Sequence, residues 1–425
     1  MRIRVQGGQP LNGEYRPSGN ANSAIAMIAA SMLTEEPVTL RNVPSTTSTG
    51  AMLEIAGSLG ATVTHDSSAL TIHTPEITRR ELTRDETGSG VGTLLFMAPV
   101  LVRRQYVRLE LDFPLNRIRT HLEALRDLGL DVITSDGAVE VRAVQWDYRD
   151  IILTQASVTA TAIVLMLAVT FGKETVITNA ASEPHVQELA RMLEEMGAQI
   201  HGVGSNVLRV FGADALHGVS ETVGPDHIEA ASVAAICALS GGRVQLNDIR
   251  GSDLRMIDKI YQRLGIKLDI DDTMLFVPRH EILTVSNREE DVDSSIETSP
   301  WPGFPSDLVA IATVVATQAR GTSLIHEKLF NDRLLFVDKL NSMGAQIVLC
   351  DPHRAIVVGP SPLYAIYMDS PDVRTGLGML GAALIARGES VIDNAQALRR
   401  SFDGVVSKLK LLGAAITIED AGLHG

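Results

Sequence analysis

The sequence predicts an α/β protein of two domains, each assembled from three copies of one repeated unit. Three observations lead to this prediction: the length of 425 residues, a short phrase that recurs six times, and apolar helical segments that alternate with short strands. A single hydrophobic core stops growing beyond about 250–300 residues, so this length favours two domains. Self-similarity at a fixed period indicates that each domain is built from copies of one supersecondary unit.

The recurring phrase first stands as LGATV at residues 59–63. Its glycine returns at intervals of 69, 68, 68, 79 and 69 residues. The six glycines are Gly60, Gly129, Gly197, Gly265, Gly344 and Gly413. Five near-equal intervals predict six copies of one unit, with an insertion in the fifth copy.

Each phrase is predicted to join an exposed helix to a strand. In the stretch 186–196, the apolar residues recur with helical spacing and leave the charges on the opposite face. Gly197 follows, and only glycine adopts at little cost the left-handed conformation that ends such a helix. Alternating stretches such as 206–212 and 355–360 then predict strands.

A second, apolar helix is predicted in five of the six units. Its segments carry almost no charge within their runs, so they are expected to be buried on all sides. They span residues 22–33, 158–171, 229–242, 306–321 and 374–388. Each domain is therefore expected to consist of three units, with the apolar helices packed inside and sheets around them.

The composition excludes several classes of partner. The net charge of −14 argues against nucleic acid, because neutralising phosphates requires an excess of Lys and Arg. The longest apolar run, 160–171, is shorter than the ~18–20 residues of a membrane span. The N-terminus has no apolar signal region, and two cysteines suggest no disulfide framework, so we expect a cytoplasmic protein. The oligomeric state is left open.

Several segments of the chain resemble the enolpyruvyl transferases, especially the branch that acts on UDP-N-acetylglucosamine. The most specific are NAASEP at 179–184, FPSD at 304–307 and NDR at 331–333, and the similarity covers essentially the whole chain. The resemblance implies two inside-out α/β domains of three units each, linked by a double crossover. One domain would span 21–227, and the other 1–20 with 228–425.

The resemblance also implies the reaction. This branch transfers the enolpyruvyl group of phosphoenolpyruvate to the 3-hydroxyl of UDP-N-acetylglucosamine, toward peptidoglycan, without a metal or an organic cofactor. Phosphoenolpyruvate and UDP-N-acetylglucosamine are thus the expected small-molecule partners.

Asp307 is the expected catalytic residue. It follows Pro305 and Ser306 at the start of an apolar helix, where all three residue types are favoured for local reasons alone. The resemblance adds that the carboxylate of this motif contacts the sugar hydroxyl and acts as its general base.

The expected substrate-binding residues lie at helix starts and turns. Ser157 and Val158 precede a long apolar helix whose first backbone N–H groups suit a phosphate. The same residue types are equally typical of an ordinary helix N-cap. The resemblance implies that uridine diphosphate binds there. The full set that it implies is Asn22, Gln155, Ser157, Val158, Leu329, Arg333 and Arg374. Asp226 and Glu229 are expected to cap a helix or form a hinge, and His227 stands where the family has Arg.

Three family cations are absent from the sequence. Ala21 replaces a Lys that contacts phosphoenolpyruvate, and Val91 and Gly404 stand at two Arg positions. An anion with a carboxylate and a phosphate needs several cations, each charge-assisted bond contributing about 1.5–3 kcal/mol.

The family's Cys-bearing, glycine-rich loop is also missing, and a shorter segment around Asp112 takes its place. The nearest bases to the missing cations are Arg117 and Arg119 in one region, and Arg399 and Arg400 in the other. Two alternatives to the family reaction therefore stay open: a paralogue that binds a UDP-sugar or a related ligand without turnover, and a transferase with a changed substrate.

Overall fold

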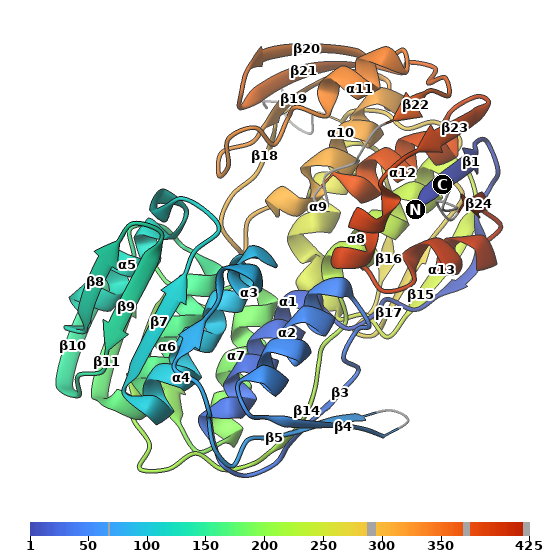
Figure 1. Cartoon of the computed structure of the whole chain (residues 1–425). Coiled ribbons are helices and arrows are strands. Elements are labelled where there is room, and N and C mark those ends of the chain that lie inside the picture. The colour runs from blue at the N-terminus through green and yellow to red at the C-terminus, as the bar shows by residue number, and fades with distance from the viewer. Residues whose placement is uncertain (67–68, 287–294, 369–374, 420–425) are drawn as a thin grey trace, which may run out of the picture. The chain divides into compact units, whose positions relative to one another are not determined.

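A computed structural model describes residues 1–66, 69–286, 295–368 and 375–419 (Figure 1). These residues form two compact units. Unit 1 contains Met1–Ser18 with Pro225–Gly425, and unit 2 contains Gly19–Gly224. Both are mixed α/β structures with small sheets, which confirms the expected fold class.

Unit 2 holds seven α-helices and three 3-10 helices in its described residues. The α-helices are α1 Ala21–Ala30, α2 Thr47–Ser58, α3 Arg84–Gly88, α4 Met97–Arg104, α5 Arg119–Asp127, α6 Val158–Phe171 and α7 Pro184–Glu195. The 3-10 helices are η1 Ser31–Leu33, η2 Val91–Phe96 and η3 Leu115–Ile118. The strands are β3 Val38–Arg41, β4 Thr62–Asp66, β5 Ala69–His73, β6 Glu81–Leu82, β7 Tyr106–Glu110, β8 Asp131–Ser135, β9 Ala138–Arg142, β10 Trp146–Ile152, β11 Gly172–Thr178, β12 Gln199–His201, β13 Val207–Phe211 and β14 Ser220–Thr222.

Unit 1 holds six α-helices and three 3-10 helices in its described residues. The α-helices are α8 His227–Ser240, α9 Arg255–Arg263, α10 Val309–Gln318, α11 Val337–Ser342, α12 Gly376–Ile385 and α13 Val405–Leu411. The 3-10 helices are η4 Gly251–Leu254, η5 Ser306–Leu308 and η6 Ala395–Arg400. The strands are β1 Arg2–Gln6, β2 Asn12–Tyr15, β15 Arg243–Asn247, β16 Asp269–Ile270, β17 Met274–Val277, β18 Ser295–Glu297, β19 Gly321–His326, β20 Gln346–Asp351, β21 Arg354–Gly359, β22 Tyr367–Met368, β23 Glu389–Ile392 and β24 Ala415–Glu419.

The described strands form six four-stranded sheets with one shared pattern. Each sheet has one parallel pair at an edge and antiparallel pairs elsewhere, as in β10-β11-β13-β12. In unit 1 the N-terminal strands complete two of the sheets, β22-β23-β1-β24 and β16-β17-β15-β2. In unit 2 the late strand β14 completes the first sheet, β14-β3-β5-β4. One sheet of unit 1, β22-β23-β1-β24, therefore combines strands from both ends of the chain.

The six repeated glycines end their helices as expected. All six have positive φ, from +86° at Gly129 to +115° at Gly197. After α7, the Ala198 N–H donates to the Leu193 carbonyl at 3.0 Å and the Gly197 N–H donates to the Glu194 carbonyl at 2.9 Å. This is the Schellman pair of hydrogen bonds, which satisfies carbonyls that the helix end leaves free.

The apolar helices are buried as expected. In unit 1, α8, α10 and α12 pack against one another, and nearly all of their residues lie in the core (Figure 1). Gly378 of α12 permits the close approach, because a Cβ there would stand 2.7 Å from the Cβ of Ala310. In unit 2, α6 packs against α4, α5 and α7. Among the described residues, no helix has both the length and the apolar character needed to cross a membrane.

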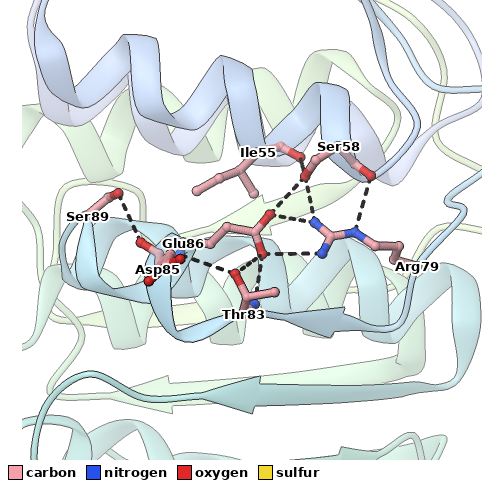
Figure 2. A network of polar contacts seen from close by, with 7 residues as sticks. All are labelled: Ile55, Ser58, Arg79, Thr83, Asp85, Glu86 and Ser89. Atoms are coloured by element: carbon pink, nitrogen blue, oxygen red, sulfur yellow. Dashed lines mark hydrogen bonds and ion pairs between the residues drawn. The ribbon is translucent and has the colours of Figure 1, made fainter.

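A polar network joins the first repeat of unit 2 to the second (Figure 2). Arg79 Nη2 donates to Ser58 Oγ at 2.6 Å, and Ser58 Oγ donates to Glu86 Oε1 at 3.0 Å. Arg79 also forms an ion pair with Glu86, and the Thr83 N–H donates to Glu86 Oε2 at 2.8 Å, closing a capping box at α3. Burial raises the pKa of Glu86, but the hydrogen bonds from Arg79, Thr83 and Ser58 outweigh it and leave the pKa lowered.

We expect Arg79→Ala to destabilise unit 2 by about 1 kcal/mol, because the network is partly exposed to solvent. The loss should be present at neutral pH and should shrink as the pH falls through the lowered pKa of Glu86, where the carboxylate of the wild type is itself neutralised. Urea denaturation followed by Trp146 fluorescence, in a Trp301→Phe background, measures it. Arg80→Ala, at the exposed neighbouring arginine, is the control; an equal loss in both variants would contradict the role of the network.

Candidate functional site

Unit 2 contains a cavity of about 330 Å³ at the start of α6. Two of the expected binding residues, Gln155 and Ser157, line it. So do Arg117 and Arg119, which the sequence offers as substitute cations. The remaining lining residues, which sequence reasoning missed, are Asn116, Thr120, His121 and Thr154.

The helix start at Ser157 suits an anion. Ser157 is the N-cap of α6, and its Oγ accepts from the Ala160 N–H at 3.3 Å. Val158 is the first helical residue, and the N–H groups of a first turn lack intrahelical acceptors. The positive end of the dipole of this 14-residue helix therefore faces the region of the cavity.

The two arginines add positive charge to the same cavity. Arg117 comes from η3, and its guanidinium lies 5.9 Å from the ring centroid of Phe113. Arg119 begins α5, is 78% exposed, and pairs with Glu123 through Nε at 2.7 Å. Against a net charge of −14, they provide a local basic pocket.

His121 joins α5 to α6 beneath this cavity. Its Nε2 lies 2.7 Å from Thr159 Oγ1, and the ring is buried. Burial lowers the pKa of His121 to about 4, so the ring is neutral at neutral pH and acts as a hydrogen-bonding group rather than as a cation. The sequence marks His121 only by its position in the first turn of an amphipathic helix, which does not distinguish it from an ordinary helix residue.

Asn22 lies at the start of α1, also in unit 2. The N-cap Asn20 accepts from the Asn22 N–H at 2.9 Å and from the Ser23 N–H at 3.0 Å. The side chain of Asn22 is exposed. Ala21, at the position of the family Lys, is buried. This helix start therefore offers an amide but no cation.

Asp307 lies in unit 1, where η5 leads into α10, so the helix itself begins two residues later than the aspartate. Its carboxylate is 48% exposed and pairs with Arg333 Nη1 at 3.1 Å. Arg333 is only 7% exposed, and its guanidinium stacks 4.6 Å from the ring centroid of Phe330. Two expected site residues, Asp307 and Arg333, are thus in direct contact, and the buried cation keeps the carboxylate in one orientation.

Leu329 and Phe330 form an exposed apolar pair beside this ion pair. Leu329 is an expected nucleotide contact, and both side chains remain partly open to solvent. Phe330 was missed by sequence reasoning, although an exposed aromatic next to a predicted contact is a recognisable signal.

The start of α8 holds a group of buried charges. Asp226 caps the helix by accepting from the N–H groups of Ile228 at 2.8 Å and Glu229 at 3.0 Å. Glu229 is fully buried, accepts from Tyr15 Oη at 2.5 Å, and pairs with Lys408 Nζ at 3.0 Å. The ring of His227 meets Trp301 edge-on at 5.4 Å. This arrangement agrees with a capping role for Asp226.

The substituted family positions carry no charge in the structure. Val91 is half-buried in η2, and Gly404 has φ +60° just before α13. Arg399 and Arg400 are exposed on η6 in unit 1. Asp112 is exposed and lies beside Gly88. Arg374 lies outside the described residues. No group of three or more His, Cys, Asp or Glu side chains suited to a metal ion occurs in the described part of the chain.

Comparisons with known proteins agree with the resemblance. A family profile described as EPSP synthase (3-phosphoshikimate 1-carboxyvinyltransferase) matches residues 5–409. The UDP-N-acetylglucosamine 1-carboxyvinyltransferase of Treponema denticola is 39% identical over 421 residues, covering 98% of this chain and 99% of that protein. The protein of that name in Bradyrhizobium diazoefficiens is 40% identical over 417 residues, covering 97% and 96%. The crystal structure of the enolpyruvyl transferase NikO from Streptomyces tendae has a TM-score of 0.87 at 22% identity, with 98% of both chains covered, which shows the shared fold.

We expect Asp226→Asn to change how the stability of unit 1 depends on pH. Burial, followed by the charge of Glu229, raises the pKa of Asp226 to about 7 from 3.8. Its contribution to stability is therefore complete below pH ~4 and is lost as the pH rises through 7. Asn keeps the cap but cannot ionise, so the variant should gain stability relative to the wild type between pH 4 and 7.

Urea denaturation across pH 4–8, followed by Trp301 fluorescence in a Trp146→Phe background, measures this difference. Glu389→Gln, at a surface carboxylate of the same unit, is the control. A difference between Asp226→Asn and wild type that stays constant with pH would refute the raised pKa.

Proposed function

We propose, from the premise that the chain belongs to the EPSP synthase family of enolpyruvyl transferases, that it transfers the enolpyruvyl group of phosphoenolpyruvate to the 3-hydroxyl of UDP-N-acetylglucosamine. The observation that carries this choice of acceptor is the cavity of unit 2. It combines a helix start, two arginines and hydroxyl groups, which are the groups that recognise a diphosphate. The names of the full-length relatives point to the same acceptor.

In unit 1, Asp307 is suited to be the general base of this reaction, with Arg333 beside it. In the proposed sequence, the Asp307 carboxylate takes the proton of the 3-hydroxyl as its oxygen bonds to C2 of phosphoenolpyruvate, while a proton is added at C3. Phosphate then leaves C2 and takes the hydroxyl proton from Asp307, the acid that protonated C3 takes a proton back from C3, and the C2–C3 double bond re-forms. Arg333, 3.1 Å from Asp307, orients the carboxylate.

The acid that protonates C3 cannot be a thiol of the 111–118 segment, because that segment contains no cysteine. Asp112 is its only carboxylic acid, and its side chain is exposed. We assign Asp112 this role as part of the proposal. Cys237 is buried in α8 and Cys350 lies on β20, so neither belongs to that segment.

A second candidate function is binding of a UDP-sugar, or of a related ligand, without turnover. The observation that favours it is the loss of charge at Ala21, Val91 and Gly404, since phosphoenolpyruvate brings two anionic groups. The cavity of unit 2 would serve this function equally well. A transferase with a changed substrate is the third possibility that these positions leave open.

Phosphate release from phosphoenolpyruvate in the presence of UDP-N-acetylglucosamine separates these candidates. We expect release by the wild type and a fall in kcat of about 10²–10⁴-fold in Asp307→Asn, which keeps an acceptor for Arg333 but no base. Glu389→Gln is the control. Binding of UDP-N-acetylglucosamine without release would favour the second candidate, and neither binding nor release would reject both.

The cavity is tested separately by calorimetric titration with UDP. We expect the double variant Arg117→Ala/Arg119→Ala to raise the Kd about 10-fold, a modest effect because Arg119 is largely exposed. Arg126→Ala, on the same helix but away from the lining residues, should leave the Kd unchanged. Equal affinities in all three proteins would rule out the cavity as the diphosphate site.

A further inference from the structure

Glu327, at the end of β19 in unit 1, is a fully buried carboxylate. Its Oε2 accepts from Ser306 Oγ at 2.6 Å. Its Oε1 accepts from the backbone N–H groups of Leu329 at 2.8 Å and Phe330 at 3.1 Å. The carboxylate therefore joins Ser306, 21 residues earlier in the chain, to the turn that directly follows Glu327.

These two segments carry the expected chemistry of unit 1. Ser306 immediately precedes Asp307, the proposed base. Leu329 and Phe330 form the exposed apolar pair, and Phe330 stacks on Arg333, which in turn pairs with Asp307. The contacts thus form a ring. Asp307 contacts Arg333, Arg333 contacts Phe330, and Phe330 donates to Glu327. Glu327 accepts from Ser306, which is the chain neighbour of Asp307.

The backbone of the same turn is anchored to the sheet. The Glu327 N–H donates to the His353 carbonyl at 2.8 Å, and His353 Nδ1 lies 2.8 Å from the Glu327 carbonyl. The Lys328 N–H donates to Thr298 Oγ1 at 2.9 Å. Since the backbone is fixed on this side, the carboxylate determines where the next two residues, Leu329 and Phe330, are placed.

A buried carboxylate is costly unless its hydrogen bonds are satisfied, and a side chain needed only to fill space would be apolar. The three donors are divided between the two oxygens of Glu327, Ser306 on Oε2 and the two N–H groups on Oε1, so the carboxylate holds the two segments together. A displacement of about 1 Å in a catalytic group is enough to lower a rate about 100-fold.

We propose that Glu327 is a positioning residue, which sets the proposed base Asp307 and the exposed apolar pair Leu329 and Phe330, with its expected nucleotide contact Leu329, in one geometry. The inference rests on the proposed function and deepens it. Glu327 does not touch the substrate. It acts through Ser306 on the base, and through two backbone N–H groups on Leu329, the expected nucleotide contact, and on its neighbour Phe330.

The contact of Glu327 with Ser306 and its contacts with Leu329 and Phe330 predict different kinetic effects. Glu327→Ala releases both segments, so kcat should fall about 10- to 100-fold and the KM for UDP-N-acetylglucosamine should rise about 10-fold. Ser306→Ala releases only the segment of Asp307, so kcat should fall while this KM stays within about 2-fold. Glu327→Gln should restore both parameters to within about 3-fold, because its amide oxygen can accept from the two N–H groups and its amide nitrogen can donate to Ser306 Oγ.

The matched control is Glu297→Gln, which removes the charge of an exposed carboxylate on the neighbouring strand β18, paired with Lys328. Circular dichroism verifies that each variant is folded, and calorimetric titration gives the Kd for UDP-N-acetylglucosamine in parallel. If Glu327→Ala does not fold, Ser306→Ala and Glu327→Gln still decide the matter, through the split between kcat and KM and through the rescue.

The outcomes separate this inference from the proposed function. Phosphate release by the wild type, with Glu327→Ala or Ser306→Ala matching Glu297→Gln, would overturn the inference and keep the function. Binding without release leaves the Kd as the readout, and a Kd unchanged by Glu327→Ala would overturn the inference. A wild type that neither binds nor releases removes the proposed function, and the inference falls with it.

Discussion

Burial of the apolar helices on every side is the constraint on which the rest of the structure depends. A helix enclosed by other helices and by sheets cannot carry a charge along its length without a large desolvation cost. Polar chemistry is therefore confined to the helix starts and to the turns between repeats. Asn22 at α1, Ser157 at α6, Asp226 at α8 and Asp307 before α10 all occupy such places. The fold thus restricts a site to helix starts and turns, and the residue types at those positions determine its chemistry.

The parts of the fold with a local cause were predictable from the sequence. A left-handed glycine after an amphipathic helix, and a long uncharged run, are both readable without tertiary information. The short α4 of the second repeat, which follows η2, was not predicted although residues 87–102 carry no charge, because three glycines and Pro99 interrupt that run. The meeting of Arg117 with Ser157 in one cavity, and the hold of Glu327 on Ser306, arise from pairing between distant segments, which no local pattern records.

The chain passes between the units twice. Within each unit, a backbone hydrogen bond joins the two segments that lead to the other unit. In unit 1 the Asp226 N–H donates to the Ser18 carbonyl at 2.8 Å, and in unit 2 the Asn20 N–H donates to the Gly224 carbonyl at 2.8 Å. The buried carboxylate of Glu229 and the ammonium of Lys408 lie next to Ser18 and fix it within unit 1. The Glu229 carboxylate, paired with Lys408, is thus a buried charge next to the residue at which the backbone leaves unit 1.

The position of β1 between β23 and β24 has a consequence for biosynthesis. Unit 2 is one continuous stretch, so it can complete its core as soon as its residues have left the ribosome. β1 must instead wait for its partner strands β23 and β24 near the other end of the chain, whereas β2 meets its partner β15 soon after unit 2 has been synthesised. At about 5–20 residues per second, the roughly 200 residues that follow unit 2 take about 10–40 s to synthesise. During that interval the apolar side chains of β1, Ile3 and Val5, have no sheet to join, so the nascent N-terminus stays exposed until the last repeat has been synthesised.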